Sequence, residues 1–156
     1  MRSNGKCAMQ QNDDAAETPE WESALGYWRI MSAQEFGATE IAAVETCVSM
    51  VSSTIKDWRD AVRGDAAAAI RIVLSQKPPE NITVKVDLAM TVLLCRAFDN
   101  AAAALALSYK LRSMPLEPKH RNRLATSWLV RNLFMARESS AIRPLPLRSS
   151  RGGRRS

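Results

Sequence analysis

With 156 residues, 46% of them hydrophobic and 24% charged, the chain has the size and composition of one globular domain. Its low aromatic content of 6%, its 6 glycines and its many alanines favour helix over strand. Three widely spaced cysteines exclude a disulfide framework and a zinc site, and no apolar run approaches the roughly 18 residues of a membrane span. We therefore expect an all-α, cytoplasmic protein without a membrane span, built as a four- to five-helix bundle with a long first helix.

The net charge of +6 hides an asymmetry along the chain. Residues 1–108 carry 10 Lys and Arg against 14 Asp and Glu, a net charge of −4, whereas residues 109–156 carry 12 against 2, a net charge of +10. Such a basic segment predicts contact with a polyanion. The alternatives are a solubilising tail and a tail that folds back on the acidic half.

The two ends of the chain are predicted to be disordered, and the helical domain lies between them. Residues 1–17 form a polar, acidic tail without hydrophobic periodicity, residues 18–138 a single helical domain, and residues 139–156 an arginine-rich tail. Thr18 and Pro19 mark the clearest helix start, because threonine caps a helix and proline suits its first position.

The first predicted helix runs from Pro19 to Arg63, and a slip in its hydrophobic register leaves a break at Gly37 open. Its 45 residues would span about 67 Å, which is too long for a compact domain of this size. The helix is therefore either broken or paired with another chain. Its outer part offers a candidate interface for a protein partner, formed by Trp21, Leu25, Trp28, Met31 and Phe36.

A seam of apolar residues runs through the second part of this helix. It consists of Ile41, Val44, Val48, Val51, Ile55, Trp58 and Val62, separated by alternating steps of three and four residues. This coiled-coil pattern predicts a helix that packs lengthwise on another helix. We favour packing on the alanine-rich helices of residues 82–114 in the same chain, and the alternative is a homodimer or another helical protein.

Further helices are predicted in the rest of the chain. Asp65 caps the first of them, and the Pro78-Pro79 pair ends it. Residues 82–86 alternate like a β-strand, but because the chain offers no partner strand they are interpreted as helix. The predicted helices cover Ala66–Ser75, Ile82–Phe98, Ala101–Met114 and Lys119–Glu138, with Leu74, Leu105 and Tyr109 among the packing residues.

Two short motifs carry a resemblance to known sequences. Pro19-x-Trp21-x5-Tyr27, followed by a helix, precedes Pro78-Pro79-Glu80-Asn81 and Lys85-Val86-Asp87-Leu88-Ala89. This arrangement resembles a group of small, uncharacterised all-helical bacterial hypothetical proteins over about residues 19–113. Asn81 stands where that group would have aspartate, and the basic C-terminal third has no counterpart. The resemblance implies a helical fold and transfers no activity or binding residue.

Residues with catalytic chemistry are scattered along the chain. His120 is the single histidine and lies among cations, so a small enzyme centred on it is only the third functional hypothesis. Asp57 and Asp60 are interpreted as intrahelical partners of nearby Lys and Arg side chains. No glycine-rich phosphate loop or metal-ligand spacing is present, and we expect no enzyme, cofactor or metal.

The basic C-terminal third is the strongest functional signal. Its candidate polyanion-binding residues are Lys119, Arg121, Arg123, Arg131 and Arg137 on the last helix, then Arg143, Arg148, Arg151, Arg154 and Arg155 in the tail. Arginine pairs with phosphates, and an arginine-glycine tail suits non-specific nucleic-acid binding. We expect a non-enzymatic helical interaction or assembly protein whose basic third contacts a polyanion.

Two alternatives for the basic third remain open. The first is a nucleic-acid-binding accessory or regulatory protein that makes its main contact through residues 119–138. The second is an anionic membrane surface, into which Leu129, Leu133, Phe134 and Met135 would insert. The membrane alternative ranks lower, because the same face is expected to cover the alanine-rich helices.

Overall fold

The computed structural model describes residues 23–142, and all regular structure within this range is helical. Its elements are the 3₁₀ turns η1 (Tyr27–Arg29) and η2 (Ala33–Glu35) and the α-helices α2 (Ala38–Met50), α3 (Trp58–Val62), α4 (Ala66–Leu74), α5 (Val84–Ala97), α6 (Ala101–Leu111) and α7 (Pro118–Ala141). The all-α prediction is confirmed. The predicted tail of residues 1–17 and most of the predicted tail of residues 139–156 lie outside the described range.

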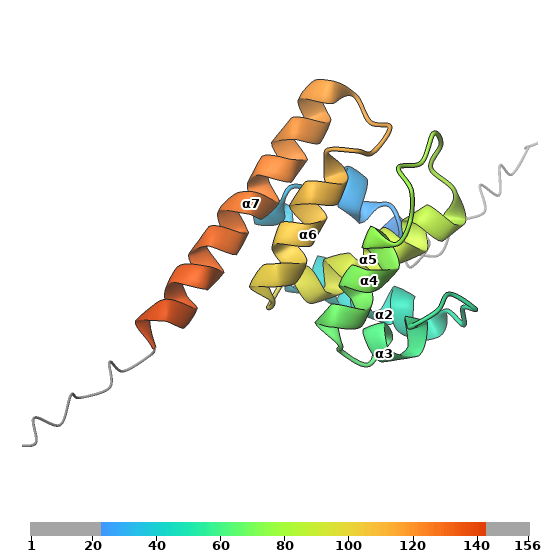
Figure 1. Ribbon diagram of the computed structural model, residues 1–156, viewed down its shortest axis with the longest axis horizontal. Coiled ribbons are helices and arrows are strands. Elements are labelled where there is room, and N and C mark those ends of the chain that lie inside the picture. Colours follow the sequence, from blue (N-terminus) through green and yellow to red (C-terminus); the bar gives the residue numbers. More distant parts are fainter. Residues whose placement is uncertain (1–22, 143–156) are drawn as a thin grey trace, which may run out of the picture.

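Helix α5 forms the centre of the fold (Figure 1). Every residue from Ala89 to Cys95 is buried, so the middle of this helix is covered on all sides. Helices α2, α4 and α6 and the turn η1 pack around it. A helix that is apolar on every face needs such an enclosed position. The helix begins at Val84, two residues later than predicted, and the hydroxyl of Thr83 caps it by accepting from the N–H of Val86 at 3.4 Å.

Helices α6 and α7 lie side by side and form the most extensive helix pair of the described residues (Figure 1). Alanines at 103 and 104 keep the surface of α6 flat, and Leu124 and Trp128 of α7 are fully buried near it. The Ser108 hydroxyl donates a hydrogen bond to the carbonyl of Ala125 across the pair, at 2.6 Å. The second half of α7 extends beyond the other helices (Figure 1).

The predicted long first helix is wrong, because α2 ends at Met50 and α3 begins at Trp58. The segment between them, residues 51–57, is irregular. It is rich in Val, Ile, Ser and Thr, which have low helix propensity because of χ1 restriction or competition for backbone hydrogen bonds. The Trp58 indole donates to the carbonyl of Val51 at 3.2 Å and closes the segment. Gly37 caps α2, so the chain also breaks there.

The apolar seam nevertheless points inward, as predicted. Val44, Val48 and Trp58 are buried, and the other seam residues are half-buried. Helix α2 packs on α5, so this part of the seam closes within the chain. Two free cysteines, Cys47 of α2 and Cys95 of α5, are buried in the same core.

The sides of α4 and α6 that face the core differ from the predicted ones. Leu74 is 50% exposed and Ile72 is buried in its place on α4. Leu105 and Tyr109 on α6 are 48% and 68% exposed, whereas Leu107 is fully buried. Alanine-rich helices lack a clear apolar stripe, so hydrophobic periodicity does not select their inward side.

Candidate functional site

The start of α7 is stabilised by a carboxylate that the prediction overlooked. Glu117 accepts hydrogen bonds from the backbone N–H groups of Lys119, at 3.0 Å, and His120, at 2.7 Å. These two bonds hold the pKa of Glu117 below its ordinary value. A capping carboxylate offsets the unfavourable placement of cations at the positive end of the helix dipole, and Pro118 occupies the first turn.

Two of the predicted polyanion-binding arginines turn toward the protein body. Arg121 donates to the carbonyl of Met114 at 3.1 Å, just beyond the end of α6. Arg131 donates to the carbonyl of Phe98 at 2.6 Å, and its guanidinium lies 6.0 Å from the centre of the Phe98 ring. Phe98 is the C-cap of α5, so Arg131 satisfies a carbonyl at a helix end, whereas the Met114 carbonyl also accepts from the N–H of Leu116 at 2.8 Å. Their role is structural.

The other described cations of α7 face solvent. Lys119, Arg123 and Arg137 are exposed and follow one side of the helix at helical spacing. We call this side the outer face of α7. It comprises Lys119, Arg123, Thr126, Val130, Leu133, Phe134, Arg137 and Ala141, all of them exposed. The predicted tail residues Arg143, Arg148, Arg151, Arg154 and Arg155 lie outside the described residues.

The middle of the outer face is apolar. Val130 is 37% exposed, Leu133 60% and Phe134 63%. Leu133 and Phe134 therefore do not cover the alanine-rich helices. The membrane alternative was ranked lower because they were expected to do so, and both side chains are instead free to contact a membrane or a partner. Steps of three and four residues from Lys119 to Ala141 mark the whole face in the sequence.

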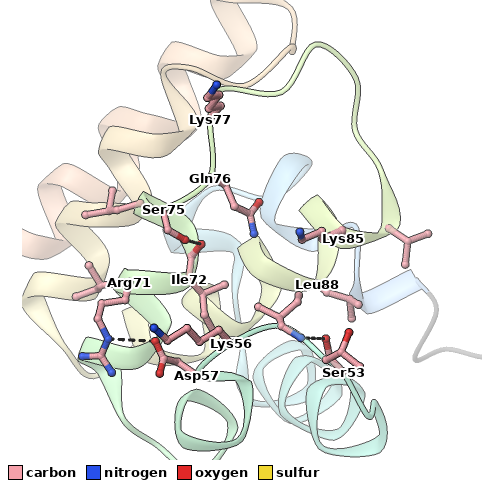
Figure 2. A pocket seen from close by; sticks show the side chains of 15 residues that line it. Ser53, Lys56, Asp57, Arg71, Ile72, Ser75, Gln76, Lys77, Lys85 and Leu88 are labelled. Atoms are coloured by element: carbon pink, nitrogen blue, oxygen red, sulfur yellow. Dashed lines mark hydrogen bonds and ion pairs between the residues drawn. The ribbon is translucent and has the colours of Figure 1, made fainter.

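A separate hollow lies on another part of the surface, between residues 51–57, α4 and the first turns of α5 (Figure 2). Its volume is about 1190 Å³. We call it the α4–α5 groove. Three lysines, Lys56, Lys77 and Lys85, line it together with apolar side chains. No local sequence signal marks the groove, because its walls come from segments that are distant in the chain.

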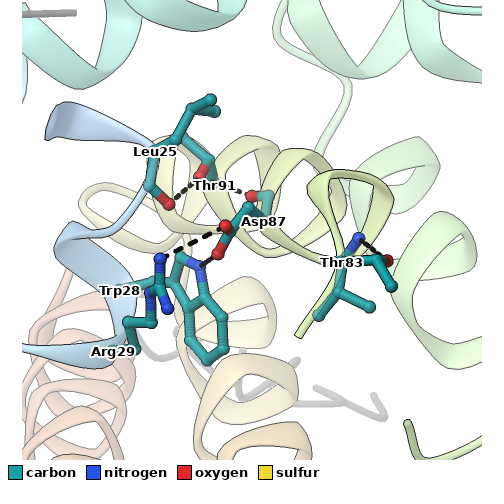
Figure 3. Close-up of polar contacts among 7 residues, drawn as sticks. Leu25, Trp28, Arg29, Thr83, Asp87 and Thr91 are labelled. Atoms are coloured by element: carbon teal, nitrogen blue, oxygen red, sulfur yellow. Dashed lines mark hydrogen bonds and ion pairs between the residues drawn. The ribbon is translucent and has the colours of Figure 1, made fainter. Parts of the chain in front are cut away.

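The predicted partner surface near the N-terminus is part of the core. Trp28 is fully buried, and its indole donates to a carboxylate oxygen of Asp87 on α5 at 2.9 Å (Figure 3). Arg29 reaches the other oxygen of Asp87 at 3.4 Å. Burial raises the pKa of the Asp87 carboxyl, and the bonds from Trp28 and Arg29 offset part of that rise. Trp28 is therefore unavailable to a partner.

Leu25 and Phe36 of that predicted surface also pack against the core. Leu25 is half-buried, and its carbonyl accepts a hydrogen bond from the Thr91 hydroxyl (Figure 3). Phe36 packs edge-on against Phe98, with ring centroids 5.1 Å apart, and lies 6.0 Å from Trp128. Met31 is half-buried, and Trp21 lies outside the described residues.

The residues considered for catalysis have structural partners. Nε2 of His120 lies 2.7 Å from the carbonyl of Arg29, and Nδ1 lies 3.4 Å from the guanidinium of Arg123. Asp57 pairs at 3.3 Å with Arg71 of α4, so the predicted pairing within one helix is wrong for this residue. Asp57 lies outside the helices, directly before α3, and has a left-handed backbone conformation with φ of 67°.

Within residues 23–142, no cluster of His, Cys, Asp and Glu side chains could hold a metal ion. The same residues include no helix that is long and apolar enough to cross a membrane. Comparison with known proteins finds no family model, no curated protein and no solved structure that matches this chain. The resemblance to helical bacterial proteins stays a prediction.

Proposed function

We propose that this chain is a non-enzymatic interaction protein that contacts a polyanion, with nucleic acid as the favoured partner, through the outer face of α7. The carrying observation is that Lys119, Arg123 and Arg137 are exposed along one side of α7. These three residues span about 27 Å of helix, which allows contact with several phosphates. Five further arginines follow in residues 143–156 and add to the same positive charge.

The exposed second half of α7 supports a binding role. A helical segment of about 12 residues is marginally stable in water when it is isolated. The exposed side chains of Val130, Leu133 and Phe134 add no hydrophobic stabilisation to this half of α7. A partner that covers them would stabilise this half of the helix. Arginine and lysine on either side would supply the electrostatic attraction, which also speeds association.

An anionic membrane surface is the second candidate, favoured by the exposure of Leu133 and Phe134 between cations. A helix that lies in a membrane interface needs this combination of apolar and basic side chains. Nucleic acid would contact the cations of the outer face and leave most of its apolar side chains exposed, whereas an anionic bilayer would contact the cations and also bury the apolar side chains.

Fluorescence anisotropy with the full chain tests the first proposal. A labelled single-stranded RNA and a DNA duplex are titrated across a series of salt concentrations. We expect binding at low salt that weakens steeply as salt rises, and replacement of Arg123 and Arg137 by alanine should lower the salt slope for duplex DNA by about two. The control is Arg59→Ala with Arg63→Ala, which removes the same charge from the exposed surface of another part of the fold. Equal loss in both variants would refute a role for α7.

Vesicles separate the second candidate from the first. Flotation is compared between vesicles of phosphatidylcholine alone and vesicles that also contain phosphatidylserine. The membrane would be favoured if the chain binds the anionic vesicles, if the double variant Leu133→Ser with Phe134→Ser no longer does, and if the chain does not bind nucleic acid. The first proposal would be favoured if the chain binds nucleic acid and the same double variant retains that binding.

A further inference from the structure

The α4–α5 groove combines apolar walls with a basic rim (Figure 2). Leu74 at the end of α4 is 50% exposed, and Val84 at the start of α5 is 69% exposed. Ile55, Ile70 and Leu88 line the same groove and are half-buried. Concave apolar surface of this kind is typical of a binding site rather than of scattered surface residues.

The charge of the rim is strongly one-sided. Asp57 is the single acidic residue of the groove lining, and Arg71 pairs with it at 3.3 Å. Lys56, Lys77 and Lys85 form no ion pair with any residue in the described range. These lysines lie around the apolar walls and not in one cluster (Figure 2). The rim therefore matches a ligand with carboxylates along its length and an apolar side facing the walls.

Hydrogen bonds hold the walls in place. The ammonium of Lys110 on α6 donates to the carbonyl of Gln76 at 2.6 Å and fixes the segment that follows α4. Lys110 is only 5% exposed, and burial lowers its pKa. On the opposite wall, the ion pair between Asp57 and Arg71, at 3.3 Å, connects the segment of residues 51–57 to α4. A groove with fixed walls loses little conformational entropy when it binds a ligand.

We propose that the α4–α5 groove binds an acidic, amphipathic helix of a partner protein. Its volume of about 1190 Å³ lies above the roughly 300–1000 Å³ of common small-molecule pockets. An amphipathic helix would place apolar anchors, spaced three or four residues apart, against Leu74, Val84 and Leu88. Its carboxylates would pair with the three lysines of the rim.

Charge argues against a second copy of this chain as the occupant. Another copy would offer two exposed apolar helical surfaces, the outer face of α7 with Lys119, Arg123 and Arg137, and Leu105 and Tyr109 of α6, which are followed at helical spacing by the exposed Arg112. Cations on either helix would meet the lysines of the groove, and like charges across an interface are strongly unfavourable. The groove and α7 thus both require negatively charged partners, an amphipathic helix for the groove and a polyanion for α7.

The test uses the full-length, ¹⁵N-labelled protein and a model peptide of roughly 18 residues, long enough to be helical. The peptide places leucines along one side of a helix and glutamates on the other, and a matched peptide carries lysine in place of glutamate. We expect the glutamate peptide alone to bind and to shift the amide signals of residues 53–57, 70–77 and 84–88. Equal binding of both peptides, or shifts confined to α7, would overturn the proposal.

Charge-reversal variants provide the matched control. Lys77→Glu with Lys85→Glu should weaken binding of the glutamate peptide about tenfold or more, whereas Arg123→Glu with Arg137→Glu on α7 should leave it unchanged. Circular dichroism establishes that both variants are folded. If the amide shifts of the groove instead follow protein concentration without peptide, a second copy is the occupant and the proposal is wrong.

The groove and α7 are tested independently by the same pair of variants. Reversal of the groove lysines should leave nucleic-acid binding by α7 in place, and reversal of the α7 arginines should remove it. Failure of peptide binding with nucleic-acid binding intact refutes the groove alone. The opposite result refutes the proposed function alone.

Discussion

The two halves of α7 belong to one continuous helix and have opposite environments. In the first half, Leu124 and Trp128 are fully buried near α6, and Arg121 is bonded to the end of that helix. In the second half, Leu133 and Phe134 are mostly exposed although they are equally apolar. Residue type alone therefore does not determine which half belongs to the core.

The contrast shows what holds the second half in a helical conformation. Arg131 and Asn132 lie where the two halves meet, and they donate to the carbonyls of Phe98 and Ala101, at 2.6 and 2.7 Å. These are the last side chains of α7 with hydrogen bonds to the other helices among the described residues. Beyond them Met135 still packs against the core, and the rest of the helix depends on its own backbone bonds or on a partner.

Removal of Trp128 should have the largest effect. Trp128→Ala leaves a cavity beside Phe36 and Phe98 and is expected to lower the free energy of unfolding by about 3–5 kcal/mol. Trp128→Phe keeps an aromatic ring and removes an indole N–H that lacks a partner in the described structure, so it should cost far less. Urea denaturation measures both variants. A similar loss in the two would show that ring packing is not the cause.

Arginine substitutions should separate the base of the projecting half from its outer face. Arg131→Ala leaves the carbonyl of Phe98 without its donor, and the expected loss of stability is about 1–3 kcal/mol. Arg137→Ala removes the same charge from an exposed position and should change stability by less than roughly 0.5 kcal/mol. Thermal denaturation of the two variants distinguishes them, and equal losses would contradict a structural role for Arg131.

The cap of α7 should make stability depend on pH. Because the folded-state pKa of Glu117 lies below its ordinary value of 4.5, its ionised form stabilises the fold. This contribution is present above 4.5 and is lost as the pH falls toward the folded-state pKa. Glu117→Gln should therefore be less stable than the natural chain at neutral pH, with the difference vanishing in acid. Urea denaturation across the acidic range measures it.

A matched carboxylate at the opposite end of the helix controls for net charge. Glu138→Gln removes the same charge near the negative end of the dipole, where a carboxylate is unfavourable. Its effect should therefore be small and opposite in sign. A pH-dependent loss equal to that of Glu117→Gln would show that overall charge, rather than the cap, is responsible.

The smallest effect on stability is expected in the exposed half. Phe134→Ala should change the free energy of unfolding by less than roughly 0.5 kcal/mol, because the side chain loses little burial. Trp128→Ala also removes an aromatic ring, but from a fully buried position, so the large difference in stability expected between the two variants reflects mainly their burial. A large destabilisation by Phe134→Ala, measured by urea denaturation, would show that the second half of α7 packs on the protein body.

Local signals in the sequence were sufficient to predict where the later helices lie. Asp65 caps α4 through the N–H of Ala68, at 3.1 Å, as predicted from its place before an alanine run. The helix predicted for Ile82–Phe98 corresponds to α5, which runs from Val84 to Ala97. Capping residues and continuous apolar runs act over a few positions, so they can be recognised without knowledge of the fold.

The remaining features depend on partners far away in the chain. Trp28 is separated by 59 residues from the carboxylate that accepts its hydrogen bond, and Arg131 by 33 residues from its carbonyl. A tryptophan or an arginine near a chain end has the same local pattern whether it is buried or exposed. The candidate site was therefore predicted as a basic segment, but the division of its arginines into inward and outward groups was not.

The two buried thiols, Cys47 and Cys95, can report how often the core opens between α2 and α5. Burial raises the pKa of Cys95 to about 12 and also raises the pKa of Cys47. Since only the thiolate reacts readily with disulfide reagents, both sulfurs are protected while α2 rests on α5. With Cys7 replaced by serine, the labelling rate of the chain measures how often these two helices separate. Ligands of either surface can then be compared by how strongly they slow that labelling.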